Sequence, residues 1–134
     1  ADDHIVPLSR QAVQVLTELR DLSLDRVHVF PHSRKAGKTM SENTVLYALW
    51  ELGYRGRMTG HGFRSLASTM LNEAGFDSAL VEAQLAHEKP DRIEAAYNRA
   101  KHLERRRLMM QSYADMLDVK AGGIVEPIAT GRGA

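Results

Sequence analysis

Apolar residues recur every three to four positions along most of this chain, which is the spacing of one face of an α-helix. The first such stretch follows Ser9, a good N-cap residue, and predicts a helix to about Leu22. A second predicted helix is capped by Ser41 and ends at Gly53, which supplies the left-handed residue of a helix stop. Its expected apolar face consists of Val45, Leu46, Leu49, Trp50 and Leu52.

The same spacing predicts further helices in the second half of the chain. One spans about His61 to Ala74 with Gly75 as its stop, and Asp77 caps a short one that ends near Ala86. Another begins at Pro90-Asp91, and the last long helix covers roughly Lys101 to Leu117. In the helix predicted from His61, the residues expected to be buried are Phe63, Leu66, Ala67, Met70 and Leu71. In the last helix they are Leu103, Met109, Met110, Tyr113 and Leu117.

Two short stretches have a β-like pattern, each close to a proline. His4 to Leu8 is expected to be an edge strand ended by Pro7, and Val27 to Phe30 a second strand stopped by Pro31. Basic residues and glycines predict loops over 32–39 and 54–60. The expected fold is mainly α with two or three short strands. Residues 1–117 would form one domain, and 118–134 a flexible or partner-docking C-terminal tail.

Composition sets only broad limits. The 134 residues suffice for about one domain with a real core, and 43% hydrophobic and 26% charged residues are ordinary for a globular chain. There is no apolar run of about 18 residues, no signal pattern and no cysteine. Because the net charge is only +1, a nucleic-acid function would have to rest on local basic clusters.

The chemistry concentrates in four residues. His61 and Arg64 are three positions apart, so a helix would place both on one face as donors to a phosphate. His87 follows the next short helix, and Tyr97 comes ten residues later. Fixed donors stabilise the charge that grows on the non-bridging oxygens of a phosphodiester under attack, and a phenolate is a suitable nucleophile. No metal or other cofactor is needed for this scheme.

Each residue also has a structural interpretation. A lone His-x-x-Arg is usually a helix start, His87 could be favoured by a helix C-terminus, and Tyr97 could be a core tyrosine. The run Arg105-Arg106-Arg107 is expected to be a solvated helix face. Zinc is disfavoured, because the histidines have neither ligand spacing nor cysteine partners.

The order of these residues resembles the tyrosine recombinase family, and within it the phage P4-type integrases. Gly60-His61-Gly62-Phe63-Arg64 is similar to the family's His-x-x-Arg, and Ala96-Tyr97-Asn98 to its nucleophile segment. Leu85-Ala86-His87 stands where the family usually has Leu-Gly-His, so Ala86 departs from the pattern. The segments 4–9 and 29–31 also match, and the likeness covers about residues 4 to 115.

The resemblance implies the catalytic-domain fold of tyrosine recombinases and a role for each of the four residues. Tyr97 would attack the scissile phosphate to give a 3′-phosphotyrosyl link, Arg64 and His61 would bind that phosphate, and His87 would donate a hydrogen bond. His61 would also be a candidate proton acceptor. The family's earlier Arg and its hairpin Lys should precede Ala1, so the chain would be the C-terminal part of a catalytic domain and inactive alone.

The resemblance also implies partners. The enzyme would act on double-stranded attachment sites in the bacterial cytoplasm, at the nucleoid, as a tetramer with accessory DNA-bending and excision factors. The cations expected to contact DNA are Arg34, Lys35, Lys38, Arg55 and Arg57. Two alternatives stay open: a type IB topoisomerase-like activity, and a non-catalytic DNA-binding or assembly module derived from a recombinase.

Overall fold

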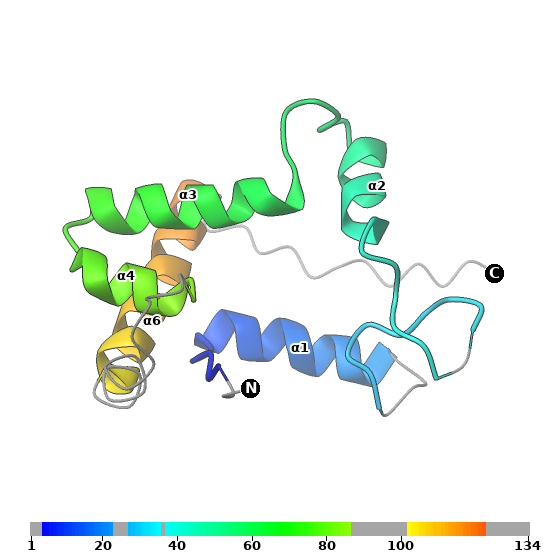
Figure 1. Ribbon diagram of the computed structural model, residues 1–134, viewed down its shortest axis with the longest axis horizontal. Helices are drawn as coiled ribbons and strands as arrows, with labels where there is room; N and C mark the ends of the chain where they lie inside the picture. The colour runs from blue at the N-terminus through cyan, green and yellow to red at the C-terminus, as the bar shows by residue number, and fades with distance from the viewer. Residues whose placement is uncertain (1–3, 23–26, 36, 87–101, 123–134) are drawn as a thin grey trace.

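Helices make up most of the structure, a computed structural model that describes residues 4–22, 27–35, 37–86 and 102–122. The helices are α1 (Arg10–Leu22), α2 (Thr44–Glu51), α3 (Gly60–Glu73), α4 (Ser78–Gln84) and α6 (Leu103–Lys120), as Figure 1 shows. The prediction of a mainly helical fold is confirmed. The helix expected from Pro90 and the tail from 123 lie outside the described residues.

Local capping explains where most of these helices begin and end. The Ser9 hydroxyl accepts a hydrogen bond from the Ala12 amide at 3.2 Å, and the Asp77 carboxylate accepts one from Ala79 at 3.0 Å. Gly53 and Gly75 have φ of 85° and 81°, the left-handed conformation expected of helix stops. These predictions are confirmed because each depends on only a few neighbouring residues.

The beginning of α2 differs from the prediction by two residues. Its N-cap is Asn43, whose side chain makes no capping hydrogen bond. Ser41 instead lies in the preceding turn, where its hydroxyl accepts from the Asn43 amide at 3.3 Å. The last helix also runs three residues beyond the predicted end, to Lys120.

Neither predicted strand forms. The β structure in the described part of the chain is one isolated antiparallel bridge between Pro31 and Thr39, and 27–30 are bends and coil. Residues 4–8 are irregular because their polar groups have other partners: the Ile5 carbonyl accepts from Arg106 at 2.7 Å, and His4 Nε2 lies 3.2 Å from the Gln84 carbonyl oxygen. A strand needs a neighbour, and the described residues do not supply one here.

The core lies between α3, α4 and α6, which pack against one another. Its fully buried members are Leu71, Leu80, Val81 and Met109. Around them are Phe76, Leu85, Met110, Tyr113 and Met116. The predicted burial of Met70, Leu71 and Met109 is confirmed.

Other predicted core positions are exposed. Phe63 and Leu66 in the first half of α3 are 47% and 42% exposed, and α2 buries only Leu49. In Figure 1, α2 stands apart from the group formed by α3, α4 and α6. The periodicity correctly identified the apolar face of these helices, but within the described residues few neighbours cover it.

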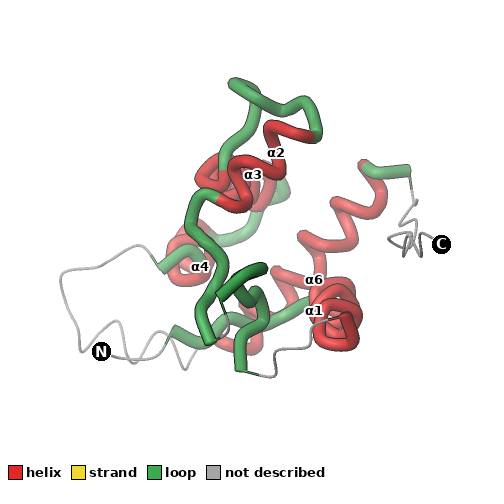
Figure 2. The backbone as a smooth tube through the Cα atoms, turned by 90° about the vertical axis from the view of Figure 1, so that its right-hand side faces the viewer, coloured by secondary structure: helices red, strands yellow, loops and turns green. Residues whose placement is uncertain are grey.

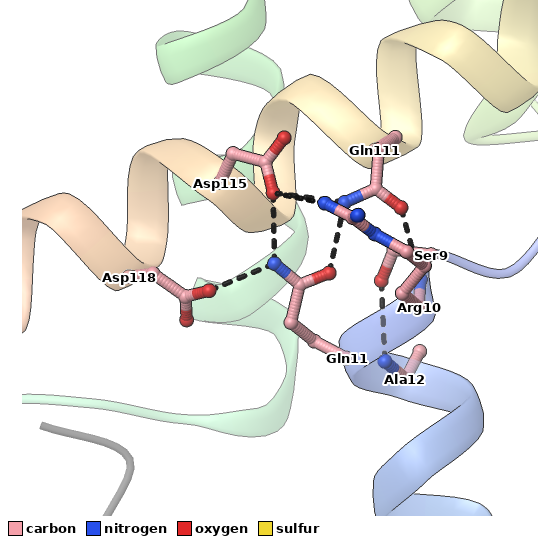
Figure 3. A network of polar contacts seen from close by, with 7 residues as sticks. All are labelled: Ser9, Arg10, Gln11, Ala12, Gln111, Asp115 and Asp118. Atoms are coloured by element: carbon pink, nitrogen blue, oxygen red, sulfur yellow. Dashed lines mark hydrogen bonds and ion pairs between the residues drawn. The ribbon is translucent and has the colours of Figure 1, made fainter. Parts of the chain in front are cut away.

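Helix α1 packs against α6, and polar side chains bind the two together. Figure 2 shows the two helices side by side, and Figure 3 shows the hydrogen bonds between them. Gln11 donates to Asp115 at 2.9 Å and to Asp118 at 2.8 Å, and accepts from Gln111 at 2.9 Å. Hydrogen bonds from Gln11 and Gln111, and the charge of Arg10, lower the pKa of Asp115. Because these contacts are directional, they fix how the first turn of α1 lies against α6.

Candidate active site

The first turn of α3 carries the two described members of the predicted site. Thr59 is the N-cap in extended conformation, and its hydroxyl accepts a hydrogen bond from the Gly62 amide at 3.1 Å. The helix therefore begins sharply at Gly60. Its N-terminal amides carry the positive end of the helix dipole, which favours an anion at this position.

His61 and Arg64 lie three residues apart on this turn, as predicted. His61 is exposed and Arg64 is partly buried. In the described part of the chain, neither the imidazole nor the guanidinium makes a hydrogen bond or ion pair. The planar guanidinium has the geometry to bind two oxygens of one phosphate.

Gly62 lies between them in a crowded position. A Cβ atom at this residue would come within 2.9 Å of Met58 Sδ and 3.6 Å of Thr59 Oγ1. The connector between α2 and α3, residues 52–59, thus passes close over the start of α3, and a glycine makes that approach possible.

The end of α4 leads directly to the position of His87. Leu85 is its C-cap and Ala86 follows with φ of 51°, in the left-handed region that L-residues other than asparagine and aspartate rarely adopt. Ala86 is where the sequence departs from the family's Leu-Gly-His pattern, and this backbone conformation explains physically why a glycine suits that position. His87 and Tyr97 themselves lie outside the described residues.

Arg106 links α4 to the N-terminal segment. Its Nε donates to Gln84 Oε1 at 2.8 Å and its terminal nitrogen to the Ile5 carbonyl at 2.7 Å. Arg106 is only 1% exposed, and this burial lowers the pKa of its guanidinium. Gln84 is the last residue of α4, so Arg106 fixes the end of the helix that precedes His87.

The expectation that Arg105-Arg106-Arg107 forms one solvated face is wrong for Arg106. Arg105 and Arg107 are exposed and pair with Asp77 at 3.5 Å and Glu104 at 3.7 Å. Arg106 instead shares the helix face of Met109 and Tyr113, at positions i, i+3 and i+7. That spacing was the signal that could have identified it.

The basic loop 31–39 presents Arg34, Lys35 and Lys38 to solvent, as expected. The Pro31–Thr39 bridge closes its base, and the His32 amide donates to the Lys38 carbonyl at 2.7 Å. The Arg34 amide in turn donates to His32 Nδ1 at 3.0 Å. The loop therefore holds a group of exposed cations on a short, internally hydrogen-bonded turn.

Arg55 and Arg57 are also exposed, but both stack on aromatic rings. The Arg55 guanidinium lies 4.7 Å from the Trp50 ring centroid, and that of Arg57 lies 5.7 Å from the Tyr54 ring centroid. These contacts were not predicted from the sequence, because nothing in the spacing shows which way the connector folds back on α2.

The described residues provide neither a cluster of metal ligands nor a membrane-spanning helix. They contain no group of three His, Cys, Asp or Glu side chains placed to hold a metal ion. Among their helices, none is both long and apolar enough to cross a membrane.

Comparison with known proteins shows the family. The model of the phage integrase family matches residues 1–104, so the chain belongs to the phage integrase family. No solved structure matches the chain significantly.

Several curated relatives are named as integrases. The integrase of Enterobacteria phage P4 is 45% identical over 88% of this chain and 28% of its own length. The prophage integrase IntA of Escherichia coli strain K12 is 42% identical over 92% of the chain and 30% of its own length. The integrase of Shigella phage Sf6 is 39% identical, over 87% of the chain and 31% of its own length. The chain thus spans about three tenths of the length of these relatives.

Proposed function

We propose that this chain is part of a site-specific DNA recombinase that integrates and excises a phage or other mobile element. The observation that carries the proposal is the first turn of α3, where His61 and Arg64 lie on one face without partners in the described residues. Membership of the phage integrase family, with relatives named integrases at 39–45% identity, supports it.

In the proposed reaction, Tyr97 attacks the scissile phosphorus. The phenolic oxygen forms a P–O bond, the bond to the 5′-oxygen breaks, and a 3′-phosphotyrosyl intermediate results. Arg64 binds the non-bridging oxygens through two parallel hydrogen bonds and keeps its charge throughout. His61 donates to the phosphate or accepts the phenolic proton, and His87 supplies a further donor. The reverse attack by a 5′-hydroxyl rejoins the strand and releases Tyr97.

The remaining catalytic groups are assigned to a longer protein. The leaving 5′-oxygen needs a proton, which we assign to a Lys upstream of Ala1. We also place a second catalytic Arg upstream of Ala1. The 134 residues alone are then expected not to cleave DNA efficiently. Residues 1–120, through the end of α6, would belong to the catalytic domain, and the segment that follows would be a flexible or partner-docking tail.

The proposed partner is double-stranded DNA at an attachment site, within the bacterial cytoplasm and nucleoid. Arg34, Lys35, Lys38, Arg55 and Arg57 would neutralise phosphates around the scissile one. Four protomers would assemble on two DNA sites, and accessory DNA-bending and excision factors would bias the direction of the reaction.

A covalent-trapping assay tests the proposal. The protein with its natural upstream residues would be mixed with a nicked half-site duplex that prevents rejoining, and the products run on a denaturing gel. We expect a shifted protein–DNA band that Tyr97→Phe abolishes. Tyr113→Phe, which removes the hydroxyl of a partly buried tyrosine on α6, is the matched control and should retain the band.

The alternatives give different outcomes in the same assay. DNA binding with no covalent band would indicate a non-catalytic DNA-binding or assembly module. A covalent band together with relaxation of supercoils, but no strand exchange between two sites, would indicate a type IB topoisomerase-like activity.

A further inference from the structure

Two arginines and three aromatic side chains gather at the end of α2 and on the connector that follows it. Arg55 lies over Trp50, as described above, and Tyr47 meets Trp50 edge-on with ring centroids 5.4 Å apart and planes at 74°. Arg57 lies over Tyr54 on the same connector. We refer to Tyr47, Trp50, Tyr54, Arg55 and Arg57 as the aromatic–arginine stack.

The backbone holds this stack in place. The Tyr54 amide donates to the Leu49 carbonyl at 2.9 Å, and the Tyr54 carbonyl accepts from Arg57 at 2.9 Å and from Met58 at 3.1 Å. Gly53 and Gly56 supply the positive φ values of 85° and 73° that these turns require. The backbone of this segment is therefore already ordered in the folded chain, so a ligand that binds here loses less free energy to ordering it.

The stack offers exposed rings together with positive charge. Tyr47 and Tyr54 are 53% and 46% exposed, and both arginines are exposed. Over 44–64 the chain has three arginines against a single acidic residue, Glu51. Trp, Tyr and Arg are also common in protein interfaces. The excess of cations, however, favours a negatively charged ligand, and the exposed rings favour one with flat aromatic groups, which together describe a nucleic acid.

We propose that the aromatic–arginine stack binds an unpaired nucleobase of a DNA strand. The base would stack on the Arg55 guanidinium, while Arg57 neutralises a neighbouring phosphate. This inference rests on the proposed function, because strand exchange requires a cleaved strand to leave its complement and so exposes bases. The connector that carries the stack runs directly into the turn of His61 and Arg64, which places it next to the phosphate site in the chain.

The stack can be tested on the 134-residue chain, because Trp50 is its only tryptophan. Trp50 fluorescence would be followed during titration with a single-stranded thymidine oligonucleotide and with an abasic oligonucleotide of the same length. We expect the thymidine strand to quench the fluorescence and to bind about tenfold more tightly than the abasic strand. Equal quenching and equal affinity would show that only phosphates are bound and would overturn the proposal.

Arg55→Lys separates stacking from charge, because it keeps the cation and removes the planar guanidinium. It should weaken binding of the thymidine strand about fivefold and leave binding of the abasic strand unchanged. Arg107→Lys on α6 is the matched control and should alter neither, and circular dichroism would check that both variants fold. An equal loss on both strands, or no loss on either, contradicts base stacking.

Two further readouts distinguish the alternatives. If Arg55→Lys abolishes self-association in sedimentation but leaves thymidine binding intact, the stack is a protein interface and the proposal fails. Because neither oligonucleotide carries an attachment site, fluorescence quenching does not depend on cleavage. A failed covalent-trapping assay would therefore refute the recombinase proposal without deciding whether the stack binds bases.

Discussion

Ala86 has a backbone conformation that is costly for an alanine, at the end of α4. Its φ of 51° places the Cβ of an L-residue close to its own carbonyl oxygen, at a cost of about 1–2 kcal/mol. Glycine does not have this penalty. We expect Ala86→Gly to raise the free energy of unfolding by about 1 kcal/mol, measured by urea denaturation followed by circular dichroism.

Ala83→Gly, three residues earlier inside α4, is the control for Ala86→Gly. Its backbone is helical, so glycine should lower the free energy of unfolding by about 1 kcal/mol. If both substitutions destabilised the protein equally, the left-handed conformation of residue 86 would be contradicted.

At the scale of elements, helices were predictable from the sequence and strands were not. A helix satisfies its own backbone hydrogen bonds, so local periodicity and caps such as Ser9 and Asp77 suffice to identify it. A strand depends on a partner far away in the sequence. The burial of Arg106 was missed for a different reason, because a run of three arginines was interpreted as a whole rather than by helix face.

Arg106 holds three elements together, and a substitution can measure how much this contributes. Arg106→Lys keeps the positive charge but cannot donate to both Gln84 Oε1 and the Ile5 carbonyl in the same geometry. We expect it to lower the free energy of unfolding by roughly 2 kcal/mol, measured by urea denaturation. Arg105→Lys, at an exposed ion pair with Asp77, should change it by less than about 0.5 kcal/mol. Equal effects at the two positions would refute the structural role of Arg106.

The contact between α1 and α6 should depend on pH through Asp115. Its pKa is lowered in the folded chain by hydrogen bonds from Gln11 and Gln111, so the unfolded state binds a proton more readily. The stabilisation is therefore complete above the unfolded pKa of about 4 and is lost as the pH falls through the folded pKa. We expect the difference in Tm between the unmodified chain and Asp115→Asn to shrink between pH 6 and pH 3. Glu73→Gln, an exposed carboxylate at the end of α3, controls for the loss of one negative charge. A Tm difference that stays constant on acidification would contradict this role of Asp115.

At the scale of the whole molecule, the sequence identified the family and the order of the site residues better than their surroundings. The His-x-x-Arg spacing predicted correctly that His61 and Arg64 share one helical turn. It could not predict that Phe63 and Leu66 beside them are exposed, or that Arg55 and Arg57 rest on aromatic rings, because these depend on contacts between elements. His87 and Tyr97 fall outside the described residues, so their roles stay predictions.

The basic loop 31–39 gives a prediction about how the whole molecule meets DNA. Arg34 is exposed on a turn closed by the Pro31–Thr39 bridge, where its guanidinium can contact a phosphate. Phosphate contacts are independent of base sequence and release counterions. We therefore expect Arg34→Ala to weaken binding equally to an attachment-site duplex and to an unrelated duplex. It should also reduce the slope of log K against log salt by about 1. Fluorescence anisotropy over a series of salt concentrations measures both quantities, with Arg107→Ala on α6 as the equal-charge control. A loss confined to one duplex would mean that Arg34 reads bases and that the loop enters a groove.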